Sequence, residues 1–559
     1  MAETLKIALA TVNPTVGDID GNAQKILSAR SSAAEQGADL VVYSELALIG
    51  YPPEDLVLKP AFQRHTREKL MDLAVTTGDG GPAMLLGCIW QEKEQLYNAA
   101  ILLDKGEIAE IRLKHDLPNY GVFDEKRRFT AGPLPLPMDF RGTKLGVMVC
   151  EDMWTTDVAA SLTKNGAEIL VVLNASPFEE DKKDLRLQHA CGRITETGLP
   201  LIYVNKVGGQ DELVFDGASF VINADNKIAF KAESWVEDIA VTDWKKTDSQ
   251  WICVTGEIAQ TEDRYTAIYE AMVCGLRDYV QKNHFPGVVL GMSGGIDSAL
   301  SAAVAVDALG ADKVRCVMMP SQYTSEESLI DAELCANRLG IQIDLVPIEP
   351  AMAAYDQMLS PLFAGTEKDT TEENIQARIR GILLMGISNK FGHMLLTTGN
   401  KSEMSVGYAT LYGDMCGGYS VLKDIYKMDV FGLSEWRNHN KPKSAFAPGG
   451  EVIPVNIITK PPTAELRPDQ KDEDSLPPYE QLDDILRCLI EEEMGIRDIV
   501  ARGHDREVVT RIEHLLYVAE YKRRQSPPGV KITRRNFGRD RRYPITNGYR
   551  NARHELHEF

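Results

Sequence analysis

The chain has 559 residues, which is more than one hydrophobic core usually organises, so we expect two large domains or more. With 44% hydrophobic and 26% charged residues, the composition is that of a folded globular protein and excludes an intrinsically disordered chain. The formal net charge of -21 would repel a phosphate backbone, which argues against nucleic acid as a partner.

Two further features predict a cytoplasmic protein without a membrane segment. Nowhere do about 18 consecutive apolar residues occur, and the acidic Glu3 precedes only a brief apolar run, so we expect neither a membrane span nor a signal peptide. The nine cysteines are odd in number and form neither a CxxC pair nor a His/Cys metal spacing. We therefore expect reduced thiols, without a disulfide framework or a zinc site.

In the first half of the chain, short β-branched runs alternate with Ala-rich segments that have a polar face. This alternation predicts strands separated by helices or hairpins in a layered α/β domain. The expected strands cover residues 6–12, 39–44, 83–89, 144–150, 169–174 and 200–205. The pattern weakens over 238–261, a polar stretch that contains Trp244 and Trp251, and we place the domain connection there. The predicted domains are therefore 1–260 and 261–559.

Each of three strings in the first half contains one reactive side chain. Glu45 lies in the string 43–46, and Lys114 is the first residue of the string 114–120. Cys150 lies in the string 149–154, at the end of a predicted apolar strand. A carboxylate, an amine and a thiol are the groups that acyl transfer through a thioester requires. In that chemistry Glu45 is the general base, Cys150 attacks an amide carbonyl, and the charge of Lys114 stabilises the oxyanion. The alternative is that Cys150 is a small buried hydrophobe, as most intracellular cysteines are.

In this order the three strings resemble the nitrilase superfamily, and the resemblance spans residues 5–241. It implies an α-β-β-α sandwich that works as an amidase and releases ammonia from glutamine. It also implies that Glu125 is an auxiliary carboxylate near the triad. The glutamine-binding positions implied by the same resemblance are Tyr120, Ser176 and Lys182.

A second α/β series follows the connection. Strand, helix and parallel strand form the unit of a doubly wound, Rossmann-like sheet, whose ligands bind at the carboxyl ends of the strands. Strands are predicted at 287–292, 314–320, 341–348 and 393–398, and helices at 299–308, 329–339 and 372–390. Basic residues dominate 521–553, a segment that fits an anionic ligand, an acidic neighbouring subunit or a solvated tail.

The most specific signal in the second half is the glycine- and serine-rich string 290–298, which lies between a predicted strand and a predicted helix. Adjacent glycines let the backbone approach an anion, and a helix N-terminus adds free N–H groups and the positive end of a dipole. The string lacks the spacing and the lysine of a Walker A loop, and a plain Gly-rich turn with a capping serine is the alternative. It resembles the loop of the N-type ATP pyrophosphatases. That resemblance implies that Asp297 helps to hold Mg²⁺ and that ATP is bound by Gly291, Met292, Ser293, Gly294, Gly295, Ile296, Asp297 and Ser298.

Downstream strings resemble NAD⁺ synthetases over essentially the whole second domain. The strings are 373–380, 397–403, 462–466 and the pair Lys522-Arg523. The resemblance implies ATP contacts at Thr398 and Thr463, a Mg²⁺-linked carboxylate at Glu403, and deamido-NAD⁺ contacts at Asn374, Arg378, Glu403, Lys427 and Lys522.

Each of these positions also has a structural alternative. Arg378 could form an ion pair on a helix surface, Glu403 could cap a helix, and Lys522 could be a solvated charge. Leu411 departs from the family pattern, because synthetases that use free ammonia tend to carry a lysine there. The contacts of the loop 408–418 therefore stay open.

Together the two halves resemble glutamine-dependent NAD⁺ synthetases. The implied reaction converts ATP, deamido-NAD⁺, glutamine and water to NAD⁺, AMP, pyrophosphate and glutamate, with Mg²⁺ but without a prosthetic group. Ammonia becomes ammonium at neutral pH and loses its nucleophilic lone pair, so we expect a passage between the sites. The resemblance also implies a homo-oligomer.

Three rival interpretations remain at this point. A GMP synthetase-like enzyme would need a histidine motif beside the nucleophilic cysteine, and none accompanies Cys150. A nonenzymatic nucleotide-binding protein with an inactive amidase fold would not need an intact set of reactive residues. A stand-alone nitrilase acting on some other amide is the third possibility.

Overall fold

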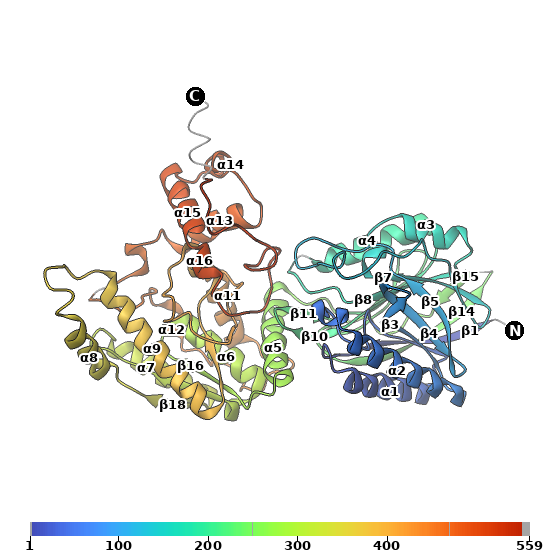
Figure 1. The fold of residues 1–559 in the computed structure, drawn as a ribbon, viewed down its shortest axis with the longest axis horizontal. Coiled ribbons are helices and arrows are strands. Elements are labelled where there is room, and N and C mark those ends of the chain that lie inside the picture. The colour runs from blue at the N-terminus through green and yellow to red at the C-terminus, as the bar shows by residue number, and fades with distance from the viewer. Residues whose placement is uncertain (1–2, 181, 249, 469, 550–559) are drawn as a thin grey trace. The chain divides into compact units, whose positions relative to one another are not determined.

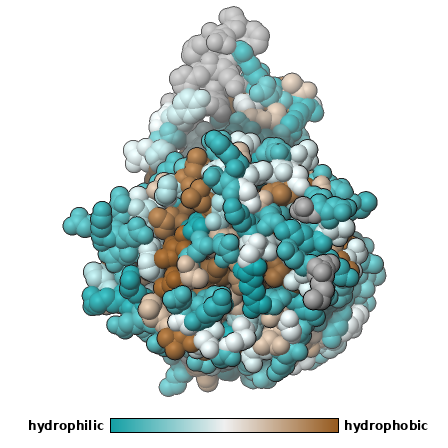
Figure 2. Space-filling model, turned by 90° about the vertical axis from the view of Figure 1, so that its right-hand side faces the viewer, coloured by the Kyte–Doolittle hydropathy of each residue, from teal (hydrophilic) through white to brown (hydrophobic). Residues whose placement is uncertain are grey.

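A computed structural model describes residues 3–180, 182–248, 250–468 and 470–549. The contacts within the chain divide it into two compact units, Met1–Glu262 and Asp263–Phe559. Within the described residues, no helix combines the length and the hydropathy that a membrane span requires. On the molecular face in Figure 2, hydrophilic side chains dominate and hydrophobic ones gather in separate patches.

The first unit is an α-β-β-α sandwich built on two packed sheets (Figure 1). The first sheet has the order β15-β14-β1-β2-β3-β4-β5, and the second has the order β13-β12-β9-β8-β7-β6. The strands of the first sheet are β1 (Thr4–Thr11), β2 (Leu40–Val42), β3 (Ala83–Glu92), β4 (Gln95–Asp104), β5 (Glu107–Leu113), β14 (Asp238–Thr247) and β15 (Gln250–Cys253). Those of the second are β6 (Met138–Phe140), β7 (Thr143–Val149), β8 (Ile169–Asn174), β9 (Leu201–Asn205), β12 (Phe220–Ile222) and β13 (Ile228–Lys231). The hairpin of β10 (Val207–Gln210) and β11 (Leu213–Asp216) forms a small separate sheet.

The alternation of side chains along the strands explains the layers. In β1, Leu5, Ile7 and Leu9 point into the core between the two sheets, whereas Ala8 and Ala10 face the helices. Helices α1 (Ile19–Glu35) and α2 (Pro60–Thr76) cover the outer face of the first sheet. Helices α3 (Asp157–Lys164) and α4 (Lys182–Thr197) cover that of the second.

The stretch 238–261, interpreted from the sequence as the domain connection, begins with sheet structure. Strand β14 pairs antiparallel with β1 over its first eight residues, and β15 pairs with β14. Trp244 and Trp251 lie in the core between the sheets. The sequence pattern looked weak because β14 alternates buried and polar residues at the edge of the core, where one face meets solvent.

The second unit contains a parallel sheet with the order β18-β17-β16-β19-β20. The strands are β16 (Val288–Gly291), β17 (Val314–Met318), β18 (Gln342–Leu345), β19 (Met394–Thr397) and β20 (Tyr419–Ser420). In chain order, β16, β17 and β18 follow one another toward one edge of the sheet, and β19 and β20 follow one another toward the other edge. The strand order therefore reverses between β16 and β19, where open parallel sheets bind their ligands.

Helices surround this sheet and continue beyond it (Figure 1). Their bounds are α5 (Arg264–Lys282), α6 (Ile296–Leu309), α7 (Glu326–Leu339), α8 (Glu349–Leu359), α9 (Thr370–Phe391), α10 (Lys401–Val406), α11 (Lys427–His439) and α12 (Val455–Thr459). The last part of the chain forms α13 (Tyr479–Ile490), α14 (Ile496–Ala501), α15 (Arg506–Val518) and α16 (Glu520–Arg523). Helices α13, α14 and α15 share a hydrophobic cluster of their own, which also includes Val406 and Tyr426.

Candidate active sites

In the first unit the predicted acid, amine and thiol come from the ends of three strands. Glu45 follows β2, Lys114 follows β5 directly, and Cys150 follows β7 directly. The Lys114 Nζ donates to Glu45 Oε1 at 2.7 Å and to Glu125 Oε2 at 2.9 Å. The four side chains are buried, with Glu45 and Lys114 exposed by 0% and 1%. The structure therefore brings Glu45, Lys114 and Glu125 into one closed cluster.

The charges of this cluster act on one another and on the cysteine. Burial favours the neutral amine of Lys114, but the charges of Glu125 and Glu45 outweigh burial and raise the pKa of the ammonium well above its usual value. Burial raises the pKa of Glu125 to about 7, although the charge of Lys114 opposes this rise. Burial and the charge of Glu45 raise the pKa of the Cys150 thiol, while Lys114 lowers it. This environment disfavours the thiolate, so a base beside Cys150 would help to form it.

Cys150 itself occupies a strained backbone position. Its φ is +47°, in the left-handed region that non-glycine residues rarely adopt, at the turn between β7 and the short 3₁₀ helix Cys150–Met153. Asp152 holds this turn, because its carboxylate accepts from Val149 N at 2.9 Å and from His115 N at 3.0 Å. One buried carboxylate thus joins the cysteine turn to the residue after Lys114.

Asn98 orients the general base and was missed by sequence reasoning. Its Nδ2 donates to Glu45 Oε1 at 2.7 Å, and Ala175 N donates to Glu45 Oε2 at 3.1 Å, so both carboxylate oxygens are held. Asn98 is fully buried within the apolar strand β4. A lone amide in an apolar strand is a usable sequence signal, since buried polar groups need partners.

The predicted glutamine-binding residues fall into two groups. Tyr120 donates to Glu151 Oε2 at 3.0 Å, and Lys182 Nζ lies 5.4 Å from the centre of the Phe123 ring. Ser176 is buried, as Lys182 is, but its hydroxyl oxygen accepts from Arg186 Nε at 3.2 Å. Glu151, the residue after Cys150, was not assigned a role from the sequence. Burial raises its pKa, and Tyr120, Lys114 and Lys182 lower it.

In the second unit the glycine- and serine-rich string forms the turn between β16 and α6. Gly294 has φ +80°, and a Cβ atom there would lie 2.2 Å from Ser328 O, so the turn requires glycine. Ser293 Oγ accepts from Gly295 N at 3.2 Å, and Ser298 Oγ donates to Gly295 O at 2.9 Å. The loop is thus held by its own serines at the N-terminus of α6, where an anion is favoured.

The second charged cluster lies next to this loop and consists of Asp297, Glu403 and Lys427. Lys427 Nζ donates to Asp297 Oδ2 at 2.5 Å and to Glu403 Oε1 at 3.2 Å, and Asn400 Nδ2 donates to Asp297 Oδ1 at 2.8 Å. Burial raises the pKa of Glu403 to about 8, with Lys427 opposing this rise and Asp297 adding to it. The structural alternative for Glu403 is present as well, since Asn400 and Glu403 form a capping box at the start of α10.

Asp297 and Glu403 offer the oxygen ligands that Mg²⁺ prefers, and each side chain is exposed by 17%. Among the described residues, no group of three or more His, Cys, Asp and Glu side chains is arranged to hold a metal ion. Two carboxylates nevertheless fit Mg²⁺, because this ion usually takes only one or two from the protein and the rest from substrate and water.

Three of the remaining predicted residues contact the loop 408–418, whose contacts could not be assigned from the sequence. Asn374 Oδ1 accepts from Thr410 Oγ1 at 2.8 Å, Arg378 Nε donates to Leu411 O at 3.2 Å, and Lys522 Nζ donates to Ala409 O at 2.7 Å. Arg378, for which a surface ion pair was the alternative, thus donates to a backbone carbonyl, and Lys522, for which a solvated charge was the alternative, donates to two backbone carbonyls. Thr398 directly follows β19, whereas the hydroxyl of Thr463 donates to Gln470 O within its own loop.

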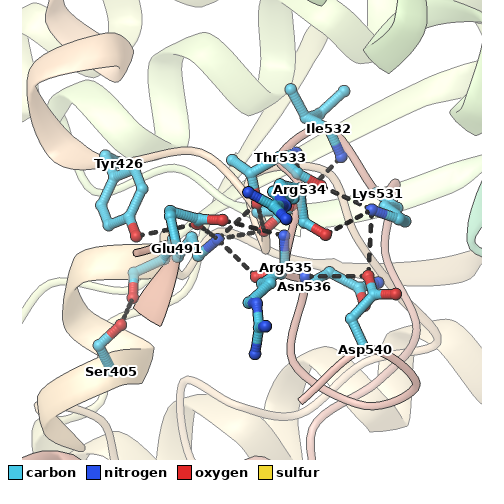
Figure 3. A network of polar contacts seen from close by, with 12 residues as sticks. Ser405, Tyr426, Glu491, Lys531, Ile532, Thr533, Arg534, Arg535, Asn536 and Asp540 are labelled. Atoms are coloured by element: carbon cyan, nitrogen blue, oxygen red, sulfur yellow. Dashed lines mark hydrogen bonds and ion pairs between the residues drawn. The ribbon is translucent and has the colours of Figure 1, made fainter. Parts of the chain in front are cut away.

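Over its described residues 521–549 the basic C-terminal segment is partly internal, which excludes a fully solvated tail there, and residues 550–553 lie outside the described part of the chain. Lys531 and Arg541 are exposed by 1% and 4%, and Lys531 Nζ pairs with Asp540 at 3.0 Å. Figure 3 shows Thr533 and Arg535 beside Glu491, whose Oε2 accepts from Arg535 N at 2.9 Å. The fully buried Lys401 Nζ donates to Thr533 Oγ1 and Glu491 Oε1, both at 2.6 Å. The segment thus anchors the start of α10, which carries Glu403.

Comparison with known proteins gives two family models and full-length relatives. Residues 6–251 match the carbon-nitrogen hydrolase model, and residues 268–526 match the NAD synthase model. The glutamine-dependent NAD(+) synthetase of Rhodobacter capsulatus is 50% identical, over 98% of this chain and 100% of that protein. The protein of the same name from Acinetobacter baylyi is 46% identical, over 98% and 99%.

Solved structures agree with these matches. The glutamine-dependent NAD⁺ synthetase from Acinetobacter baumannii, in complex with adenosine diphosphate, aligns with a TM-score of 0.78 at 43% identity, over 98% of this chain and 99% of that one. A glutamine-dependent NAD(+) synthetase from Cytophaga hutchinsonii aligns with a TM-score of 0.83 at 21% identity, over 99% of each chain, and shows the shared fold.

Proposed function

Because the chain belongs to the family of glutamine-dependent NAD(+) synthetases, we propose that its first unit releases ammonia from glutamine and that its second unit uses this ammonia to amidate deamido-NAD⁺. The chain is an enzyme with an amidase-type and a synthase-type domain, and ATP is a substrate of its reaction. We place the domains at 1–260 and 261–559. The carbon-nitrogen hydrolase match does not favour a GMP synthetase-like enzyme.

The observation that carries the glutaminase half is the bond of Lys114 to both Glu45 and Glu125. Glu45 takes the proton of the Cys150 thiol, and the thiolate attacks the side-chain carbonyl of glutamine. The Lys114 ammonium stabilises the thiolate and the oxyanion, and Glu125 keeps Lys114 charged after Glu45 is protonated. Glu45 passes this proton to the amide nitrogen, which leaves as ammonia, and water then hydrolyses the thioester with Glu45 again as the base, so that glutamate is released and the thiol of Cys150 is restored. Tyr120, Ser176 and Lys182 hold glutamine.

The synthetase half uses the turn after β16 to bind ATP and the converging residues near the loop 408–418 to bind the dinucleotide. The amide of Gly294 and the start of α6 face the phosphates. Asp297 and Glu403 would hold Mg²⁺, which neutralises phosphate charge when bound. The nicotinate carboxylate displaces pyrophosphate from ATP, and AMP then leaves when ammonia attacks the acyl-adenylate. Lys427 orients the phosphates between Asp297 and Glu403.

The test is a coupled assay on the full-length protein with glutamine, ATP, Mg²⁺ and deamido-NAD⁺. We expect NAD⁺, AMP and glutamate to form, with a ratio of NAD⁺ to glutamate close to one if ammonia passes between the sites without loss. Absence of NAD⁺ from both glutamine and ammonium chloride would overturn the proposed function. Glutaminase activity without any nucleotide-dependent product would favour a stand-alone amidase.

We also propose a cytoplasmic homo-oligomer. All nine cysteines have free thiols, which fits a reducing compartment. Large hydrophobic side chains are exposed on the neighbouring helices α8 and α9, namely Met358, Ile382, Met385 and Phe391, and a second copy could cover them. Sedimentation of the protein and of Ile382→Glu tests this proposal. A monomer at micromolar concentration would contradict it.

A further inference from the structure

Helix α13 carries a polar stripe beside its apolar face. Tyr479, Asp483 and Arg487 are spaced by four residues, so they lie on one face. The neighbouring residues Leu482, Ile485, Leu486 and Leu489 belong to the hydrophobic cluster of the later helices. The stripe faces the first turn of α11, the helix that begins with Lys427.

Each member of the stripe contacts this turn. The Tyr479 ring centre lies 5.1 Å from Lys427 Nζ, the Asp483 Oδ2 accepts from Met428 N at 2.8 Å, and Arg487 Nη2 donates to Asp429 Oδ2 at 2.6 Å. Three consecutive residues of α11 are therefore held by three successive turns of α13.

Asp483 has a second link to Lys427 that passes through Ser402. The Ser402 hydroxyl donates to Asp483 Oδ1, and its oxygen accepts from Lys427 N at 2.9 Å. Ser402 directly precedes Glu403, the other carboxylate partner of Lys427. The carboxylate of Asp483 thus fixes the backbone beside both Glu403 and Lys427.

The first turn of α11 depends on this external carboxylate. Its N-cap residue, Tyr426, makes no side-chain capping bond, and a helix needs acceptors for its first N–H groups. Asp483 and Ser402 supply them, and the helix dipole favours a negative charge at this end. Asp483 is exposed by only 4%, and burial raises its pKa to about 6, while Ser402 and Met428 N lower it. A carboxylate this deeply buried is retained because both of its oxygens are bonded.

We propose that Asp483, acting through Ser402, is a positioning residue for the ATP-dependent step, because it holds Lys427 against Asp297 and Glu403. The inference rests on the proposed function, since it assigns Asp483 to the lysine that orients the phosphates. A displacement of a catalytic group by about 1 Å costs up to about 100-fold in rate.

The first experiment compares Ser402→Ala with Ser405→Ala in the full-length protein. Ser405 is the matched control, because it is equally buried in α10 and its hydroxyl donates at 2.6 Å only to Lys401 O of the same helix (Figure 3 shows its side chain). With ammonium chloride as the amide donor, we expect Ser402→Ala to lower kcat for NAD⁺ formation about 10- to 100-fold. Ser405→Ala should stay within about twofold, and glutaminase activity without nucleotides should be unchanged in both.

A double-mutant cycle then separates positioning from general stability. If Ser402 acts through Lys427, the Ser402→Ala change should alter kcat by less than about twofold in a Lys427→Met background, with product quantified by mass spectrometry. If the two effects multiply instead, the proposed route through Lys427 is wrong.

The conservative variant Asp483→Asn adds an independent measurement. Its amide oxygen can accept from Met428 N while its NH₂ group donates to Ser402 Oγ, so we expect it to keep more activity than Asp483→Leu, which makes neither bond. Equal losses in folded Asn and Leu variants would overturn the proposal. If Asp483→Leu does not fold, the Ser402 pair and the cycle decide. Failure of the unmodified protein to make NAD⁺ from ammonium would refute the proposed function, whereas equal rates for Ser402→Ala and Ser405→Ala in an active protein would refute only this inference.

Discussion

Each unit holds a buried lysine between two carboxylates, but the two clusters differ in how closed they are. In the first unit, the side chains of Lys114, Glu45 and Glu125 are exposed by 0%, 0% and 5%. In the second unit, Lys427 is exposed by 3%, whereas Asp297 and Glu403 are each exposed by 17%. The same combination of charges therefore appears in a sealed and in an accessible form.

The difference matches what each cluster must bind. The amidase cluster carries out covalent chemistry on one small amide, so its geometry can be complete before the substrate arrives. The synthetase cluster must admit phosphates and a metal ion, whose charges compete with Lys427 for the two carboxylates. A sealed cluster gains preorganisation, and an accessible one gains room for a charged substrate.

The largest expected effect is the loss of the glutamine-driven activity alone, which would distinguish the two units. Cys150→Ala removes the nucleophile, so we expect glutamine-driven NAD⁺ formation to fall by about 1,000-fold or more. NAD⁺ formation from ammonium chloride should stay within about twofold of the native rate, because the second cluster lies in a separate unit. Both rates are measured by NAD⁺ production at saturating substrates. Loss of both activities would show that the two units do not work independently.

The contrast in closure predicts different losses of stability when each lysine is removed. Lys114→Met leaves two sealed carboxylates without a counter-charge, and breaking a buried pair in this way costs about 3–5 kcal/mol. Lys427→Met should cost less, because water reaches Asp297 and Glu403. Calorimetric unfolding of both variants measures this difference. Equal destabilisation would remove the proposed distinction between sealed and accessible clusters.

Asn98 tests how far preorganisation of the sealed cluster depends on its outer partners. Asn98→Ala removes the 2.7 Å bond to Glu45 Oε1 and leaves the general base free to rotate. We expect kcat/KM for glutamine hydrolysis to fall about 10- to 100-fold, with the ammonium-driven reaction unaffected. An unchanged glutaminase rate would mean that Lys114 and Ala175 N alone orient Glu45.

The smallest expected effect comes from replacing one helical glycine in each unit, which serves as a reference for the larger changes. Gly192 in α4 and Gly386 in α9 have open space where a Cβ would lie. Replacing either one with Ala should stabilise its helix by about 0.5–1 kcal/mol. Thermal unfolding should show a small rise, and both activities should be retained. A loss of activity in either variant would indicate that these helix positions move during the reaction.

Much of the fold could be predicted from the sequence, because its signals are local. Apolar runs bounded by polar segments predicted the strands that precede Glu45 and Cys150, whereas β5 before Lys114 was missed, and the glycine-serine string predicted the turn between β16 and α6. Strand β14 was missed as a strand, because its pairing with β1 joins residues more than 200 positions apart and leaves only a half-buried alternating pattern. The basic C-terminal segment was also ambiguous, because its partners Glu491 and Asp424 lie far from it in sequence.

The sequence by itself determined which residue types stand at the ends of the strands, and therefore the kind of chemistry available. Tertiary structure alone decided which buried groups support them: Asn98 reaches Glu45 across 53 positions, and Asp483 reaches Ser402 across 81. The physical reason is that a reactive side chain is marked by its own string, whereas the partner that orients it is chosen by packing and by the need of every buried polar group for a hydrogen bond.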